Sequence, residues 1–227
     1  MPLDDDRLEQ FKNTKRAYDN MPQKKEFIIP TRCESKIRKY LEENDLARGV
    51  KIIPYIVEVG FNCSRALNIG VRNAIYDSII ITSPEVKPLT PVLDQLEKLL
   101  GTNIICQVWD EDEHGNVFRS LINSKNRRNK IRAPGMYFLA MFNKADIERI
   151  NGWDEEFMRG YAFEDKDFGA RWIRANISFV VRDDIQGQHQ YHLRKETIRK
   201  GNITNYRLFQ KKDAEKIIRC VNGLIKL

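Results

Sequence analysis

Three carboxylates stand within four residues at Glu164, Asp165 and Asp167, where the pattern of the following residues predicts the start of a helix. Acidic side chains are favoured at a helix N-terminus because the helix dipole is positive there, and this accounts for one or two of them. Three together repel one another, and repulsion with partial burial raises the pKa of at least one carboxyl group. Such a group suits a general base, so the cluster is a candidate catalytic site, with helix capping as the alternative.

Two of the three histidines, His189 and His192, stand three residues apart after an apolar run at 179–182. An imidazole at this spacing can bind a metal, although a structural pair is the more common arrangement. Glu85 follows three consecutive isoleucines in the sequence S-P-E. A carboxylate at the end of a strand can hold a divalent cation against phosphates, or it can simply belong to a turn.

The elements that carry these residues follow an alternating pattern in the first half of the chain. Apolar runs predict strands at 26–30, 51–59, 77–82 and 104–109, and amphipathic stretches predict helices at 35–44, 64–74 and 88–100. This alternation predicts a Rossmann-like α/β fold with a mostly parallel sheet and helices on both faces. Ligands of such sheets bind beyond the carboxyl ends of the strands, which places residues 31–32, Glu58 and residues 83–85 around one crevice.

The second half is predicted to hold fewer strands. We expect a strand at 137–142, a short helix at 144–150, a turn at 151–152, a helix at 164–176 and a strand at 179–182. The remaining histidine, His114, lies in an acidic run that is typical of a hairpin tip, and it is assigned no role. The last 20 residues are predicted to form an amphipathic helix. Its apolar face would hold Ala214, Ile217, Ile218, Val221 and Leu224.

The bulk composition excludes several classes of protein. The 227 residues can bury a substantial core, and 41% hydrophobic with 31% charged residues is typical of a soluble globular domain. No apolar run approaches the roughly 20 residues that span a bilayer. The polar, acidic N-terminus is unlike a secretory signal. Four scattered cysteines do not form a zinc or disulfide pattern, so we expect a cytoplasmic or cytosol-facing protein.

The net charge of +7 is concentrated in residues 193–227, which hold ten lysines and arginines against three acids. A second basic group, which includes Arg127 and Arg128, lies in a polar stretch. Such surfaces are either simply solvated or attract an anion, such as a sugar nucleotide, an anionic membrane or a nucleic acid. No nucleic-acid-binding motif accompanies them, so a nucleic-acid-binding protein is the weakest of the alternatives.

The order of the motifs resembles that of GT-A-fold glycosyltransferases, closest to family 2 with a galactosyltransferase-type C-terminal half. The matching segments are F-I-I-P-T-R at 27–32, F-N-C-S-R-A-L-N-I-G at 61–70, I-I-I-T-S-P-E at 79–85, G-W-D-E-E-F at 152–157, E-D-K-D-F-G-A-R at 164–171 and H-Q-Y-H at 189–192. The resemblance covers 27–192 and is most specific between 152 and 171. It implies one domain over 1–227, with a nucleotide-sugar half at 24–110, an acceptor and catalytic half at 111–192 and a basic helical tail at 193–227.

This resemblance also implies roles for individual residues. Asp165 matches the catalytic base, with Glu164 beside it. The implied donor contacts are Pro30, Thr31, Arg32, Glu58, Arg65, Asn68 and Ser83, and the implied acceptor contacts are Gly152, Trp153 and Asp167. Metal binding by Mn²⁺ or Mg²⁺ would use Glu85 and His189, with His192 as the second choice.

One position departs from the family pattern. Ser83 stands where the family's D-x-D motif has its first aspartate, so Glu85 is the only carboxylate of that motif. Glu85, a histidine and the two donor phosphates could still complete a metal shell. Alternatively, the basic tail could neutralise the departing diphosphate without a metal.

The sequence therefore predicts an inverting transferase that moves a sugar from a nucleotide-diphosphate sugar, expected to be a UDP-sugar, to a hydroxyl group. The resemblance implies a glycan, glycoprotein or lipid-linked acceptor, and the basic tail could contact an anionic membrane. A GT-A domain that binds a sugar nucleotide without transferring it is the main alternative, because of Ser83.

Overall fold

The computed structural model describes residues 1–56, 62–122, 124–125, 136, 138–159, 162–193 and 198–225. The strands are β1 (Phe27–Thr31), β2 (Val50–Pro54), β3 (Ser78–Thr82), β4 (Val86–Pro88), β5 (Ile104–Glu111), β6 (Val117–Ile122), β7 (Leu139–Asn143) and β8 (Val180–His189). The helices are η1 (Asp5–Arg7), α1 (Leu8–Asp19), α2 (Glu34–Glu43), α3 (Cys63–Asn73), α4 (Val92–Glu97), α6 (Lys144–Arg149), η2 (Glu155–Arg159), α7 (Glu164–Arg174) and α8 (Ile198–Ala214).

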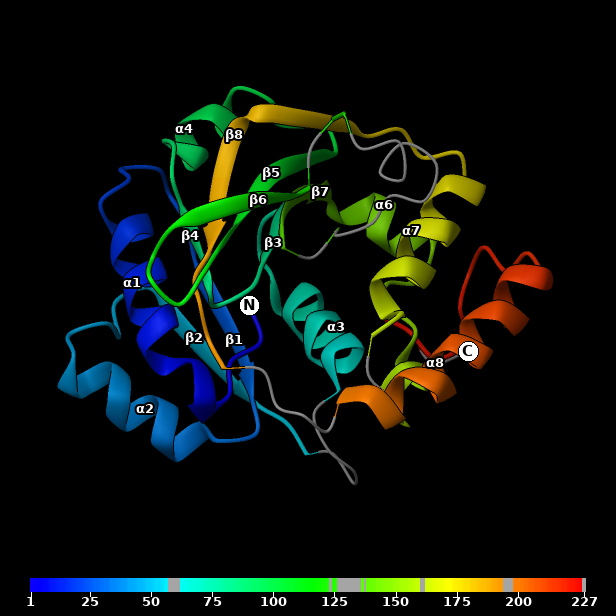
Figure 1. The fold of residues 1–227 in the computed structure, drawn as a ribbon, viewed down its shortest axis with the longest axis horizontal. Helices are drawn as coiled ribbons and strands as arrows, with labels where there is room; N and C mark the ends of the chain where they lie inside the picture. Colours follow the sequence, from blue (N-terminus) through cyan, green and yellow to red (C-terminus); the bar gives the residue numbers. More distant parts are fainter. Residues whose placement is uncertain are drawn as a thin grey trace.

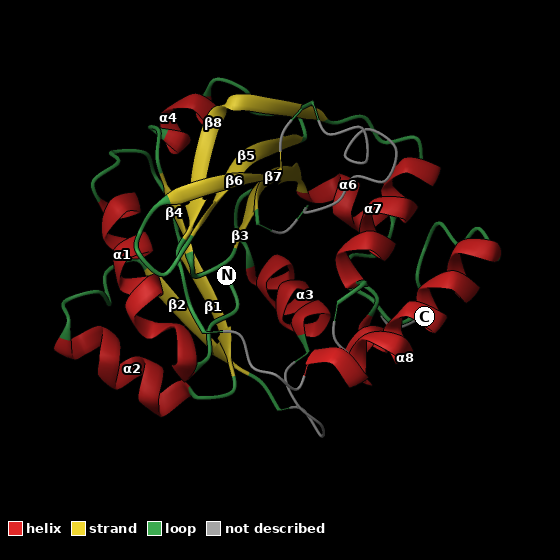
Figure 2. Ribbon diagram, in the orientation of Figure 1, coloured by secondary structure: helices red, strands yellow, loops and turns green. Residues whose placement is uncertain are grey.

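The strands form an α/β architecture with helices on both sides of the sheet. In Figures 1 and 2, α1, α2 and α4 lie on one side of the strands, and α3, α6 and α7 lie on the other. β1 and β2 form a parallel pair, and the larger sheet has the order β3-β7-β5-β8-β4, with β6 paired to β5. The predicted α/β fold with helices on both faces is therefore confirmed.

Strand direction differs from the prediction of a mostly parallel sheet. Among the described strands, only β1·β2 and β5·β8 pair in parallel, and the other four pairs are antiparallel. The β5–β6 hairpin causes part of this difference, because its turn reverses the chain at Gly115, where φ is 82°. The Asp112 side chain holds this turn by accepting hydrogen bonds from the backbone N–H groups of His114 and Asn116. His114 lies at a hairpin tip, as predicted.

β3, β5 and β8 nevertheless run in the same direction, because β3 and β5 are each antiparallel to β7, and β5 is parallel to β8. Their carboxyl ends therefore open at one edge of the sheet, the edge where ligands of α/β folds bind. β8 is longer than the predicted 179–182 strand and includes His189. α4 is shorter than the predicted 88–100 helix, because Pro88 belongs to β4 and pairs with Gly187 of β8.

One continuous core joins the two predicted halves of the chain. It includes Leu67 from α3, Val108 from β5, Phe142 from β7 and Trp172 from α7. A smaller core lies under α2, where Ile37 and Leu41 pack against Ile29 and Phe11 among others. The single-domain organisation stays a prediction.

The C-terminal prediction is wrong in its helix boundaries. α8 ends at Ala214, and the chain turns at Lys216, where φ is 54°. Residues 217–225 then run against the turn at 150–152, where the Leu224 N–H donates to the Asn151 carbonyl oxygen at 2.8 Å. A Cβ at Gly223 would lie 1.8 Å from that oxygen, so only glycine fits this close approach. Helical spacing of apolar residues had suggested a helix, but long-range backbone contacts determine this segment.

Among the described helices, none combines the length and the apolar character needed to cross a membrane.

Candidate active site

A cluster of three possible metal ligands lies at the carboxyl ends of β3 and β8. Glu85 follows β3, His189 is the last residue of β8, and His192 follows it. One ligand atom from each of the three lies within 4.8 Å of the others. Nε2 of His189 is 3.6 Å from Oε1 of Glu85, and Nε2 of His192 is 3.8 Å from the same oxygen. The structure thus brings together all three residues for which a metal role was predicted.

The surroundings of this cluster orient its side chains for metal binding. Nδ1 of His189 lies 3.1 Å from Oδ1 of Asp110 on β5, which leaves Nε2 turned toward Glu85. Carboxylates commonly hold metal-bound histidines in this way. Burial alone would raise the pKa of Glu85, but the bond and charge of His189 bring it below its usual value. Burial lowers the pKa of His192, which favours the neutral imidazole that a metal requires.

The predicted catalytic carboxylates begin α7, as expected. Burial and the neighbouring charge of Asp165 raise the pKa of Glu164 to about 7. The two residues before the helix, Ala162 and Phe163, have φ angles of 64° and 76°. Neither is glycine, so this left-handed backbone is strained, and such strain is concentrated at functional sites.

The metal cluster and the carboxylate pair lie in the same region, because the charges of Glu85, Glu164 and Asp165 all act on Cys63. Burial raises the pKa of the Cys63 thiol well above its usual value, and the charges of Glu164, Asp165 and Glu85 raise it further. Cys63 is the first residue of α3, the helix that carries the predicted donor residue Arg65. The candidate metal ligand Glu85 and the candidate catalytic carboxylates Glu164 and Asp165 therefore lie near the N-terminus of α3.

The raised pKa of Glu164 predicts a pH dependence of stability. The folded protein holds this proton more tightly than the unfolded chain, so the contribution of Glu164 to stability declines as pH rises from its ordinary pKa of 4.5 toward 7. We expect Glu164→Gln to raise the melting temperature more at about pH 8 than at about pH 5, because glutamine resembles the protonated acid. Thermal unfolding of both proteins across this range tests the prediction, and an equal difference at both pH values would contradict it.

The predicted donor residues lie along β1 and α3. Thr31 is buried, and its hydroxyl accepts a hydrogen bond from the Cys33 N–H at 3.0 Å. The exposed Arg32 is paired with Asp4, with Nε 3.1 Å from Oδ2. Burial raises the pKa of Tyr55, and the smaller effects of the Arg32 and Arg65 charges both lower it. Pro30 lies in β1 and the partly exposed Ser83 follows β3, whereas Glu58 lies outside the described residues.

Asn68, Gly152 and Trp153 contact one another inside the protein. The Asn68 side chain donates to the Trp153 carbonyl oxygen at 2.8 Å and accepts from the Trp153 N–H at 2.9 Å. The Trp153 ring is fully buried and stacks on Phe168 with 4.0 Å between ring centres. A Cβ at Gly152 would lie 2.4 Å from Oδ1 of Asn68. The Asn68 and Trp153 side chains therefore fix the turn before η2 from inside the protein, and their predicted donor and acceptor roles stay predictions.

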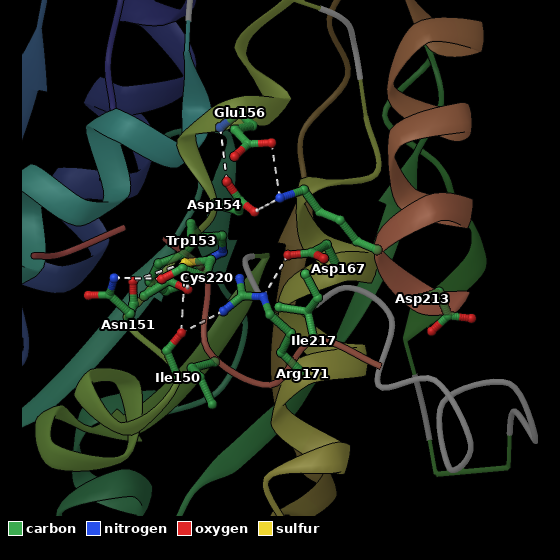
Figure 3. A network of polar contacts seen from close by, with 12 residues as sticks. Ile150, Asn151, Trp153, Asp154, Glu156, Asp167, Arg171, Asp213, Ile217 and Cys220 are labelled. Carbon is green, nitrogen blue, oxygen red and sulfur yellow. Dashed lines mark hydrogen bonds and ion pairs between the residues drawn. The ribbon is translucent and has the colours of Figure 1, made fainter. Parts of the chain in front are cut away.

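Asp167 is buried as well. Its carboxylate accepts a hydrogen bond from Nε of Arg171 at 2.7 Å, and Arg171 also donates to the Ile150 carbonyl oxygen at 2.8 Å (Figure 3). Both side chains are fully buried. Asp167 thus lies within the core, paired with its i,i+4 partner Arg171, and its predicted acceptor contact stays a prediction.

A pocket of about 500 Å³ opens beside the histidines. Its lining consists of residues 110–114 and 118–119 of the β5–β6 hairpin together with His189, Tyr191 and His192. Sequence reasoning missed the hairpin as part of this region. In the sequence, the acidic run at 110–113 and the nearby exposed Phe118 could have indicated this surface. Only the pairing of β5 with β8 places the hairpin beside His189 and His192.

Comparison with known proteins identifies this architecture as the GT-A fold of glycosyltransferases. The family described as the N-terminal domain of galactosyltransferase matches residues 120–196, about a third of the chain. This match includes α7 and the histidines. No curated protein matches the sequence significantly.

Three solved structures of two proteins illustrate the likeness. The mannosyltransferase PcManGT from Pyrobaculum calidifontis, in complex with GDP-Man and Mn²⁺, has a TM-score of 0.61 at 13% identity, over 95% of this chain and 60% of that one. TarS 1–349 from S. aureus has a TM-score of 0.70 at 10% identity, over 96% of this chain and 64% of that one. The same TarS fragment with UDP-GlcNAc has a TM-score of 0.66 at 11% identity, over 96% of this chain and 68% of that one. The chain thus spans about two thirds of these proteins or less, and the likeness concerns the fold.

Proposed function

We propose that this chain is an inverting glycosyltransferase domain that transfers a sugar from a nucleotide-diphosphate sugar to an acceptor hydroxyl group. The observation that carries this proposal is the Glu85–His189–His192 cluster at the carboxyl ends of β3 and β8 in a GT-A fold, with Glu164 and Asp165 close enough for their charges to act, like that of Glu85, on Cys63. A carboxylate pair and a candidate cation site near one helix N-terminus match the two needs of the reaction. These are a stronger nucleophile and a stabilised leaving group.

The donor is proposed to be a nucleotide-diphosphate sugar, with a UDP-sugar as the first choice. The similar structures include one complex with GDP-Man and others with UDP-GlcNAc and UDP, so this fold accommodates such donors. In this chain, the charges of Arg32 and Arg65 both act on Tyr55, and these two cations could attract an anionic donor. The donor would displace Asp4 from Arg32 or share that cation with it.

Asp165 is the proposed general base. It would take the proton from the acceptor hydroxyl group as the acceptor oxygen forms a bond to the anomeric carbon. The bond between that carbon and the diphosphate oxygen breaks on the opposite face, so the anomeric configuration inverts. Burial and the charge of Asp165 raise the pKa of Glu164 to about 7. Protonation of Glu164 lessens the repulsion between the two carboxyl groups.

Glu85, His189 and His192 would hold a divalent cation. Two imidazoles and one carboxylate favour Mn²⁺ over Mg²⁺, because magnesium prefers oxygen ligands alone. When bound, such an ion stabilises the negative charge on the leaving diphosphate. The two histidines supply the ligands that the replacement of an aspartate by Ser83 removes from the family motif. The contact of His189 with Asp110 fixes which ring nitrogen is available.

Donor and metal binding can be tested together by thermal unfolding with a panel of UDP- and GDP-sugars, with and without Mn²⁺. We expect one donor class to raise the melting temperature more in the presence of Mn²⁺, because a ligand at 100 times its Kd stabilises a protein by about 2.7 kcal/mol. His189→Ala should remove the Mn²⁺-dependent part, whereas Lys39→Ala, at an exposed position of α2, should preserve it. If no donor raises the melting temperature, the proposal is contradicted.

Turnover distinguishes transfer from binding alone. Release of the nucleoside diphosphate from the stabilising donor, either by transfer or by slow hydrolysis, is expected of the enzyme. Stabilisation without any release would favour the alternative of a non-catalytic sugar-nucleotide-binding domain, which Ser83 motivates. The acceptor class, membrane contact through residues 193–227 and a cytosol-facing location stay predictions.

A further inference from the structure

The connecting segment, residues 154–159 and 162–163, lies between the buried Trp153 turn and α7, and α8 contacts both η2 and α7. Asn205 of α8 is buried, and its side-chain amide donates two hydrogen bonds to this segment. Its Nδ2 lies 3.1 Å from the Phe157 carbonyl oxygen and 2.8 Å from the Ala162 carbonyl oxygen. One side chain thus links η2 to the last turn before α7.

The second of these bonds falls on strained backbone. Ala162 and Phe163 are consecutive residues with positive φ, a conformation that side chains other than glycine adopt only when the surrounding structure holds them. The Phe163 carbonyl oxygen then accepts from the Asp167 N–H at 2.9 Å, which starts the hydrogen-bond ladder of α7. The direction in which Glu164 and Asp165 leave the segment therefore depends on how these two residues are held.

α8 also holds the Phe163 side chain. The Phe163 ring centre lies 5.4 Å from that of Tyr206 and 5.8 Å from that of Phe209. Aromatic pairs at such distances are favourable beyond the area they bury. Asn205 and Tyr206 are adjacent in sequence, so one turn of α8 contacts the Ala162 backbone and the Phe163 ring together.

At the other end of the segment, Lys212 of α8 binds Asp154 and Glu156. Its Nζ is 2.7 Å from Oδ2 of Asp154 and 3.0 Å from Oε2 of Glu156, and Figure 3 shows both carboxylates turned toward this amine. α8 therefore anchors the segment at its start through Lys212 and at its end through Asn205. If the Asn205 contacts were lost, Lys212 would still hold the start of the segment. Only its end, next to Glu164 and Asp165, would then be displaced.

We infer that Asn205 is a positioning residue that holds the strained Ala162–Phe163 pair and so aims Glu164 and Asp165 at the reaction site. This inference rests on the proposed function, because it assigns α8 to the carboxylates that the proposed reaction uses. The inference also assigns α8, which belongs to the basic tail at 193–227, a role inside the protein, whereas the charge of this tail had indicated only contact with an anion. Without the Asn205 amide, the two carbonyl oxygens lose their donor and the backbone can relax toward negative φ.

The test compares Asn205→Ala with Thr204→Ala, a matched substitution at an exposed neighbouring position of α8. Both are assayed well below their unfolding temperatures. We expect Asn205→Ala to lower kcat by about 10- to 100-fold, since displacements of about 1 Å have effects of this size. The donor KM should change by less than about twofold, because ground-state binding is preserved. Thr204→Ala should leave both constants unchanged.

Hydrogen exchange provides a second readout that does not need activity. The Asp167 amide, which bonds to Phe163, should exchange faster in Asn205→Ala, whereas amides of β5 should exchange at the native rate. A native kcat together with native exchange at Asp167 would overturn the inference. A lower melting temperature with native kcat would show a merely structural role and would overturn it as well.

Failure of the proposed function gives a different pattern. If the native protein turns over no sugar nucleotide, that proposal fails, and exchange at Asp167 alone decides whether Asn205 holds the start of α7. If Asn205→Ala does not fold, Tyr206→Ala replaces it, since Tyr206 is 45% exposed and its loss removes the contact with Phe163 and one exposed hydrogen bond from Gln210. It should shift kcat and exchange in the same direction by a smaller factor, and no shift would overturn the inference.

Discussion

Replacing Asp165 with asparagine is expected to reduce sugar transfer by about 10²–10⁴-fold, the usual contribution of a general base. Asparagine has nearly the same shape but cannot accept the acceptor proton. Donor affinity should stay native, because none of the predicted donor residues belongs to α7. The comparison of kcat with the donor Kd, measured by calorimetry, checks the prediction.

Two further variants sharpen this result. Glu164→Gln should have a smaller effect on kcat and should shift the pH profile, because it removes the group whose pKa is about 7. Asp94→Asn is a matched control, since Asp94 is likewise an acid in the first turn of a helix, but in α4 and paired with Lys98 at 2.8 Å. It should leave transfer unchanged. Near-native turnover by Asp165→Asn would exclude Asp165 as the base.

Replacing Arg171 with methionine is expected to destabilise the protein by about 3–5 kcal/mol, the typical effect of removing one partner of a buried ion pair. Arg171 and Asp167 are both fully buried, and Arg171 also satisfies the Ile150 carbonyl oxygen. Methionine fills a similar volume but leaves the Asp167 carboxyl group without its cation. Burial already raises the pKa of Asp167 despite the attraction of Arg171, so this carboxyl group poorly tolerates a lost partner. Urea denaturation measures the change.

The double variant Asp167→Leu with Arg171→Met separates this effect from lost packing. It should recover much of the stability, because well-packed apolar pairs often replace buried ion pairs without loss. Arg38→Met is the matched control for an i,i+4 pair, since Arg38 and Glu34 are 2.7 Å apart but exposed, and such pairs contribute less than about 1 kcal/mol. A native stability of Arg171→Met would show that the buried pair is not important to the fold.

Several features of this protein could be predicted from the sequence because short-range physics determines them. Apolar runs define β1, β3 and β5, and the acids at 164–167 define the N-terminus of α7. The ligand types at Glu85, His189 and His192 also indicated a metal site before their contacts were known. The order of these motifs indicated the GT-A fold, since each motif follows its own strand or helix.

Only the tertiary structure decided which of the motif residues are buried. Asn68, Trp153 and Asp167 each belong to one of the matching motifs, and all three are buried, because burial depends on what distant elements pack against them. The direction of β7 and the course of residues 217–225 have the same cause. Hydrophobic periodicity reports that a side chain needs a core, but it does not report which segment supplies that core. For this reason the sequence determined the chemistry near Glu164 and Asp165, and long-range packing by α8 decided how these carboxylates are held.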